Sequence, residues 1–188
     1  MKDMDDKTKK ICCIWLNGPD RTGKNKLARM LTAALEDRGM PVECLDEETI
    51  VSQLGSHPSD KMENAGAPLL RAAFTAHLLT RNGVTVVVAA AIENPDVQRR
   101  IRDQLPHLVD VAIHSPVIPR LTEDQGPEPN IILNIGQENP GQEELDEILA
   151  RLIKFLEISN LIPVGKKEDL TAEESALIQE RLKSLGYL

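Results

Sequence analysis

A glycine-rich segment near the start of the chain carries the clearest chemical signal. Residues 18–25 read G-P-D-R-T-G-K-N, so that Gly18 and Gly23 enclose four residues and Lys24 follows at once. Glycines at this spacing let a loop turn so that successive backbone N–H groups point at phosphate oxygens, and the lysine adds a mobile positive charge. We therefore predict a phosphate-binding loop (P-loop) for ATP or ADP. The predicted nucleotide-binding residues are Gly18, Arg21, Thr22, Gly23, Lys24 and Asn25.

Two positions of this loop leave alternatives open. The P-loop pattern continues with a Ser or Thr whose hydroxyl binds Mg²⁺, but this chain has Asn25. An amide oxygen can coordinate a hard cation, although from a longer and differently aimed side chain. We expect Asn25 to be a weak Mg²⁺ ligand and nucleotide binding to depend little on Mg²⁺. Arg21 is consistent both with a contact to the terminal phosphate and with a solvated side chain.

A second group of polar residues follows the short apolar run at residues 41–45, which predicts a strand. Asp46, Glu47 and Glu48 stand where open α/β sheets place their ligand chemistry. In a phosphoryl-transfer site one carboxylate orients the acceptor hydroxyl or accepts its proton, and another holds a metal-bound water. We assign Asp46 and Lys24 as the candidate catalytic residues. The alternative is a solvated helix start, because acids are favoured at helix N-termini.

The elements that must position these residues are visible in the apolar pattern. Short apolar runs predict strands, and apolar residues at helical spacing predict the helices between them. Strands alternating with helices indicate an α/β fold, a doubly wound parallel sheet of about five strands with helices on both faces. The continuous β-branched run at residues 84–92 predicts the centre of the sheet. The predicted strands are residues 11–16, 41–45, 84–92, 108–113 and 130–135, and the predicted helices are residues 24–38, 68–80, 95–105 and 143–156.

Composition restricts the partners. The chain has 188 residues, close to the size of one domain, and 22 Lys and Arg against 30 Asp and Glu give a formal charge of -8. This balance argues against a broad surface for nucleic acid or anionic membrane. No apolar run approaches the ~20 residues of a membrane span, and we expect a cytoplasmic protein. The three cysteines, Cys12, Cys13 and Cys44, lie in apolar runs and are expected to be buried reduced thiols.

The C-terminal part differs from the rest of the chain. We predict a kinase-like domain at residues 1–157, and a linker with an amphipathic helix at residues 158–188. Thr171 and Glu174 form a capping-box pattern, and an apolar stripe follows them at helical spacing. That stripe needs a partner. The partner is either the chain's own domain, a second copy of the chain in a homodimer, or another protein.

From residue 11 to about residue 156 the chain resembles the adenylylsulfate kinase family, whose members phosphorylate the ribose 3′-hydroxyl of adenylylsulfate with Mg-ATP. The family follows its P-loop with L-D-G-D-N-x-R, and residues 45–51 fill that slot, with Asp46 and Glu48 as the two acids and Val51 in place of the arginine. The family's L-G-F-S-x-x-D-R-x-x-N is matched in spacing by residues 54–64. There Ser56 replaces the phenylalanine, Lys61 replaces the arginine and Asn64 is kept.

The later motifs of the family are less complete. Its I-S-P-Y-R-x-x-R corresponds to residues 92–99, where Arg99 alone of the arginines stays in register. Its basic lid, R-D-P-K-G-L-Y-x-K, corresponds to residues 120–126, which hold one cation and two acids. The resemblance implies that the acceptor-binding residues are Glu48, Lys61, Asn64 and Arg99. It implies an ATP-dependent kinase whose activity on adenylylsulfate is weak or lost. The alternative is a non-catalytic nucleotide-binding protein with a regulatory or scaffolding role.

Overall fold

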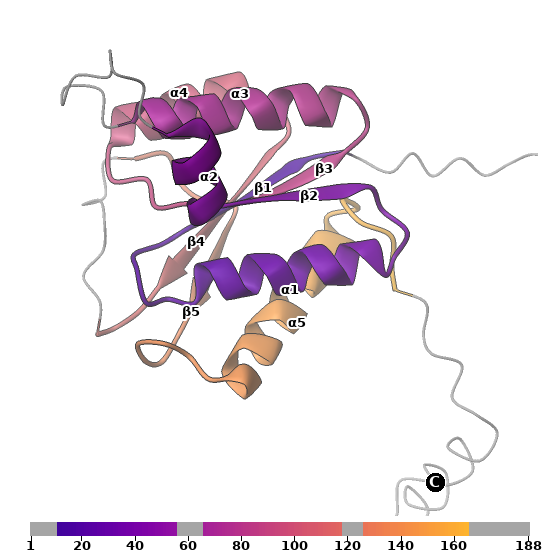
Figure 1. Cartoon of the computed structure of the whole chain (residues 1–188). Helices are drawn as coiled ribbons and strands as arrows, with labels where there is room; N and C mark the ends of the chain where they lie inside the picture. Colours follow the sequence, from indigo (N-terminus) through magenta and orange to yellow (C-terminus); the bar gives the residue numbers. More distant parts are fainter. Residues whose placement is uncertain (1–10, 56–65, 118–125, 166–188) are drawn as a thin grey trace, which may run out of the picture.

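The computed structural model describes residues 11–55, 66–117 and 126–165, to which the structural statements below refer (Figure 1). The strands are β1 (Cys13–Asn17), β2 (Val42–Asp46), β3 (Thr85–Ala89), β4 (Leu108–His114) and β5 (Ile131–Asn134). The helices are α1 (Lys24–Glu36), α2 (Glu47–Leu54), α3 (Ala67–Arg81), α4 (Pro95–Gln104) and α5 (Gln142–Ile158). Each predicted element within these ranges is present with shifted ends, and α2 is additional. The helix predicted after Thr171 lies outside the described residues.

The strands form one parallel sheet in the order β2-β3-β1-β4-β5, which confirms the predicted fold class. The prediction that residues 84–92 form the sheet centre is wrong, because β1 is the middle strand and β3 lies between β1 and β2. The strand is also shorter than predicted and ends at Ala89. All of β3 is nevertheless buried. Burial on both faces marks any interior strand, so it could not distinguish the middle strand from its neighbour.

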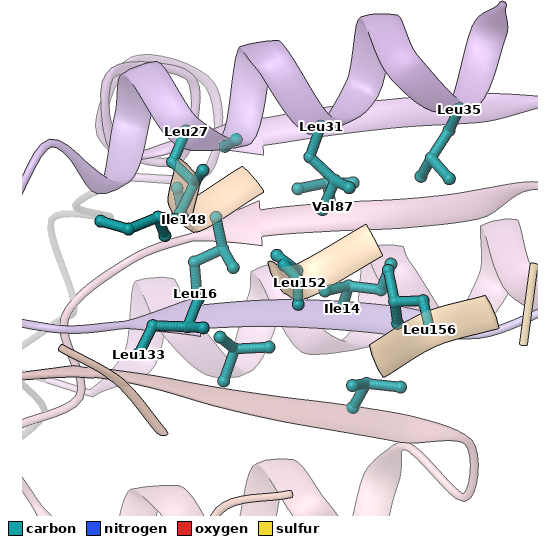
Figure 2. Close-up of a cluster of buried hydrophobic side chains, with 14 of the residues drawn as sticks. Ile14, Leu16, Leu27, Leu31, Leu35, Val87, Leu133, Ile148, Leu152 and Leu156 are labelled. Carbon is teal, nitrogen blue, oxygen red and sulfur yellow. The ribbon is translucent and has the colours of Figure 1, made fainter. Parts of the chain in front are cut away.

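Helices cover both faces of the sheet, with α1 and α5 on one side and α3 and α4 on the other (Figure 1). Successive side chains of a strand point to opposite faces. Ile14 and Leu16 of β1 therefore join the cluster under α1 and α5, which Figure 2 shows with Leu31 and Leu152. Trp15 joins the opposite cluster, and its indole Nε1 donates to the carbonyl oxygen of Ala90 at 3.0 Å. Both layers thus fix β1, whose carboxyl end leads into the P-loop.

All three cysteines are free thiols. Cys12 and Cys13 are buried. Burial raises the pKa of Cys12 to about 11, and it also raises the pKa of Cys13. Cys44 is half-buried, and burial also raises its pKa. The thiols therefore stay protonated at neutral pH, as expected of structural cysteines. Within the described ranges no helix has the length and apolar character needed to cross a membrane.

The residues after α5 still contribute to the core. Ile162 is buried in the cluster of α1 and α5, and Leu161 packs against it. The backbone N–H of Gly165 donates to Glu157 Oε1 at 3.0 Å. The domain boundary after residue 157 remains a prediction, because most of the segment beyond it lies outside the described residues.

Candidate functional site

The glycine-rich segment connects the end of β1 to the start of α1 as a tight loop. Gly23 is the N-cap of α1 with φ +74°, a left-handed conformation that favours glycine, and a Cβ there would lie 3.0 Å from Pro140 Cγ. A Cβ on Gly18 would lie 3.0 Å from the carbonyl oxygen of Ile113. Thr22 is buried, and its Oγ1 donates to the carbonyl oxygen of Pro19 at 2.8 Å. The loop therefore depends on both glycines.

The N-terminus of α1 is suited to an anion. Its N-cap offers no side-chain hydrogen bond, and no acidic residue stands in its first turn. The first N–H groups of a helix have no partner within the helix, and the helix dipole places positive charge there. A phosphate group is the type of ligand that such an end attracts.

Lys24 is buried, with only 4% of its side chain exposed, and its ammonium is held by two carboxylates. Its Nζ lies 2.9 Å from Asp20 Oδ1 and 3.0 Å from Glu47 Oε2. The hydrogen bond from Lys24 lowers the pKa of Asp20. The lysine thus already holds two anionic oxygens at hydrogen-bond distance, which is the contact that a phosphate requires.

Asn25 fits the role of a weak cation ligand in part. Its Oδ1 is buried without a hydrogen-bond partner, and an amide oxygen is a ligand type that Mg²⁺ accepts. Among the described residues, however, no three or more His, Cys, Asp or Glu side chains are grouped to bind a metal ion. Weak Mg²⁺ binding at Asn25 remains a prediction.

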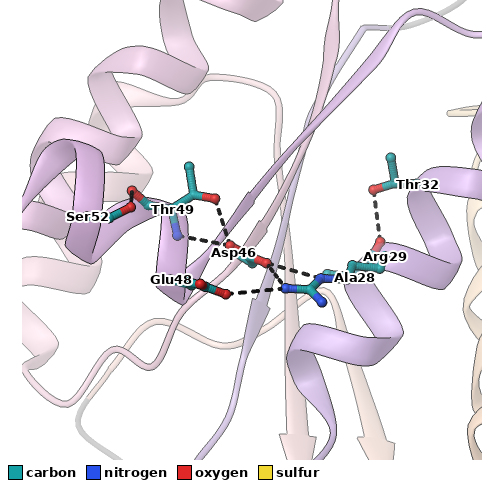
Figure 3. Close-up of polar contacts among 7 residues, drawn as sticks. All are labelled: Ala28, Arg29, Thr32, Asp46, Glu48, Thr49 and Ser52. Carbon is teal, nitrogen blue, oxygen red and sulfur yellow. Dashed lines mark hydrogen bonds and ion pairs between the residues drawn. The ribbon is translucent and has the colours of Figure 1, made fainter.

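Asp46 links β2, α1 and α2, as Figure 3 shows. Its Oδ1 accepts hydrogen bonds from the backbone N–H of Thr49 at 3.0 Å and from Thr49 Oγ1 at 2.8 Å, and so caps α2. Its Oδ2 accepts from Arg29 Nη2 at 2.6 Å and from Arg29 Nε at 3.2 Å. Burial raises the pKa of Asp46, but the hydrogen bonds from Arg29 and Thr49 outweigh it, and the pKa is lowered. Asp46 is therefore ionised at neutral pH.

The acidic triplet is a helix start, the alternative that the sequence left open. Glu47 and Glu48 form the first turn of α2, and they point to different cations. Glu47 reaches Lys24, whereas Glu48 is exposed and lies 3.7 Å from Arg29 Nη2 (Figure 3). Sequence reasoning missed Arg29. The sequence shows a cation on the helix after the P-loop, but its partner Asp46 can be recognised only once the position of β2 in the sheet is known.

The remaining predicted site residues are dispersed. Arg21 has φ +64° and an exposed side chain that pairs with Glu138 at 3.0 Å. Arg99 lies on α4 and pairs with Asp96. Lys61, Asn64 and Ser56 lie outside the described residues, as do residues 120–125 of the segment that corresponds to the family lid. The structure thus brings together the P-loop and the end of β2, and two of the four predicted acceptor-binding residues lie outside the part of the chain that it describes.

A P-loop at the carboxyl end of the middle strand, in a parallel sheet of order β2-β3-β1-β4-β5, defines a P-loop kinase fold. The family described as "Adenylylsulphate kinase" matches residues 10–125, which is more than half of the chain. The chain therefore belongs to the adenylylsulphate kinase family.

Individual relatives give the extent of the similarity. The adenylyl-sulfate kinase of Rippkaea orientalis is 31% identical over 104 residues, 55% of this chain and 58% of that protein. The probable adenylyl-sulfate kinase of Pyrococcus abyssi is 28% identical over 176 residues, 93% of this chain and 97% of that protein. The chain thus spans 58% of the length of the Rippkaea relative and 59% of the length of a Synechocystis relative, less than two thirds in both cases.

Two solved structures support the fold. The hexameric APS kinase from Thiobacillus denitrificans has a TM-score of 0.68 and 20% identity, and the match covers 84% of this chain and 31% of that chain. The Mycobacterium tuberculosis APS kinase CysC in complex with AMPPNP and APS has a TM-score of 0.64 and 18% identity, with 79% of this chain and 98% of that chain covered. At this identity the likeness concerns the fold alone.

Proposed function

We propose that this chain is an ATP-dependent phosphotransferase that acts on the 3′-hydroxyl of adenylylsulfate, with slow turnover. The observation that carries the nucleotide part is the buried ammonium of Lys24, which stands beside the uncapped start of α1 and holds two anionic oxygens. Membership in the adenylylsulphate kinase family supports the choice of nucleotide and acceptor. Bound ATP would supply the phosphoryl group that is transferred.

The residues of the loop have separate roles in this function. The backbone N–H groups of residues 20–23 and the ammonium of Lys24 would hold the phosphates, and the hydrogen bond from Thr22 to the carbonyl oxygen of Pro19 would stabilise the loop. Asn25 would be a weak ligand for Mg²⁺. Arg21 would contact the terminal phosphate only after leaving Glu138.

Asp46 is the proposed catalytic carboxylate. Because its pKa is lowered, Asp46 is better suited to orient the acceptor hydroxyl or a metal-bound water as an anion than to accept a proton. Arg29 and Thr49 fix its two oxygens. Glu48 is exposed two residues further along and is proposed, with Lys61, Asn64 and Arg99, to bind the acceptor.

Slow turnover follows from the residues on the acceptor side. Val51 is exposed on α2 at the position where the family pattern has an arginine. Each charge-assisted contact to a phosphate or sulfate is worth about 1.5–3 kcal/mol, so the loss of a few contacts weakens acceptor binding by orders of magnitude. Two further differences from the family pattern are expected to weaken acceptor binding: Ser56 in place of the phenylalanine, and an acidic segment in place of the basic lid.

A coupled ADP-release assay with adenylylsulfate and Mg-ATP tests the proposed turnover. We expect a turnover number at least about a hundredfold below the ~10 s⁻¹ typical of enzymes. An assay without adenylylsulfate gives the background from ATP hydrolysis. Turnover near ~10 s⁻¹ would show that the acceptor side is intact and that its substitutions are compensated.

A second function is favoured by the internal ion pairs of the site. Arg21 and Lys24, the cations closest to the expected phosphates, both pair with carboxylates of the chain itself. A non-catalytic nucleotide-binding protein with a regulatory or scaffolding role needs no free cation for phosphoryl transfer. ADP binding together with no ADP release from ATP and adenylylsulfate would favour this function. A homodimer or a protein partner held through residues 171–185 is proposed with either function.

A further inference from the structure

Glu47 contacts Lys24 from α2, an element outside the P-loop itself. It belongs to the first turn of α2, whose N-cap is Asp46, and Asp46 is fixed in turn by Arg29. Its side chain is 38% exposed, whereas Asp20, the other partner of Lys24, is 83% exposed and belongs to the loop itself. Glu47 is therefore the more firmly positioned of the two carboxylates.

The side-chain charges around the loop oppose the binding of a phosphate. The described ion pairs at this end of the sheet join three cations to five carboxylates, which leaves a net charge of -2. The carboxylates repel an approaching phosphate group and so weaken its binding. The cations are Arg21, Lys24 and Arg29, and the carboxylates are Asp20, Asp46, Glu47, Glu48 and Glu138.

We infer that Glu47 is an internal counter-ion of Lys24 that a phosphate-bearing ligand has to displace, and that it thereby sets the affinity of the site for phosphate. The inference rests on the proposed nucleotide binding. An ammonium has three N–H donors; one donates to Asp20 at 2.9 Å, and Glu47 Oε2 forms an ion pair with the same nitrogen at 3.0 Å. A phosphate oxygen that approaches Lys24 competes with both carboxylates. Displacement of Glu47 separates a charge-assisted pair whose lysine is buried, and this cost reduces the net affinity.

The variant Glu47→Gln tests the inference because it removes the charge and keeps the shape of the side chain. We expect calorimetry to show ADP and inorganic pyrophosphate binding about three- to tenfold more tightly than in the wild type, since a partly exposed pair is worth less than a buried one. Adenosine, which has no phosphate, should bind equally to both proteins. The matched control is Glu36→Gln at the far end of α1, about 18 Å along the helix from Lys24, and should leave ADP binding unchanged.

A second measurement needs no nucleotide. In ligand-free protein labelled with ¹⁵N-lysine, the ammonium protons of Lys24 should be protected from exchange with water in the wild type and exchange faster in Glu47→Gln. Equal protection in both proteins would overturn the role of Glu47 as counter-ion. ADP binding that is the same in wild type and Glu47→Gln would overturn its effect on affinity. Absence of ADP binding to either protein, with Lys24 protected only in the wild type, would instead refute the proposed nucleotide site.

Discussion

Replacement of Lys24 by Met should weaken ADP binding by about ten- to 150-fold while the protein stays folded. The expected loss corresponds to one charge-assisted hydrogen bond, about 1.5–3 kcal/mol. Methionine keeps an apolar stem in the buried position of Lys24. The carboxylates that lose their partner, Asp20 and Glu47, are both partly or largely exposed and can be hydrated. Titration calorimetry gives the affinity, and urea unfolding should show a change in stability below about 1 kcal/mol.

The matched control is Lys26→Met, which removes the same charge from an exposed position of the same helical turn. It should change ADP affinity by less than about threefold, because a solvated charge at that distance is largely screened. An equal loss in both variants would show that Lys24 acts only through the general field of the helix. An unchanged affinity in Lys24→Met would place the nucleotide elsewhere.

The variant Asp110→Ala should lower the free energy of unfolding by about 2–4 kcal/mol without a direct effect on the nucleotide site. Asp110 lies on β4 with 3% of its side chain exposed, and its Oδ2 accepts hydrogen bonds from Gln98 Nε2 and Arg102 Nη2, both at 3.1 Å. Loss of one member of a buried ion pair costs ~3–5 kcal/mol, and the partial exposure of Arg102 reduces that cost. Arg102 also donates to the carbonyl oxygen of Glu128 at 2.7 Å, so the segment before β5 depends on the same group.

Urea unfolding at pH 7 measures this effect. Asp103→Ala on α4 is the control, because it removes an exposed carboxylate from the same helix as Arg102. Its free energy of unfolding should stay within about 0.5 kcal/mol of the wild type. Similar losses in both variants would show that Asp110 contributes no more than an exposed acid.

The parts of the fold that follow from local sequence were predictable. The loop is encoded within residues 18–25 and the helix after it by the apolar spacing of residues 24–38, so both could be predicted from local sequence. The alternation of apolar runs and helical stripes gave the parallel sheet. The acidic triplet was ambiguous because the same residues suit a carboxylate site and a helix start. The structure shows the helix start, and the catalytic role of Asp46 stays a proposal.

The parts that depend on strand order were not predictable. The contact between Glu47 and Lys24 requires that β2 and β1 stand on either side of β3, which no local pattern reveals. Arg29 was missed for the same reason, since its partner is at the end of β2. Asp110 carried a signal, an acid within the apolar run of β4, but its partners on α4 are fixed only by packing.

Titration of the wild-type protein with ADP, with and without Mg²⁺, tests the nucleotide site most directly. The preserved backbone cradle and Lys24 predict that ADP binds in both conditions, and Asn25 at the hydroxyl position predicts less than about a threefold difference between them. The fluorescence of Trp15, the only tryptophan, can report the same binding from the strand that leads into the loop. No binding at millimolar ADP, or binding only when Mg²⁺ is present, would contradict this interpretation of the loop.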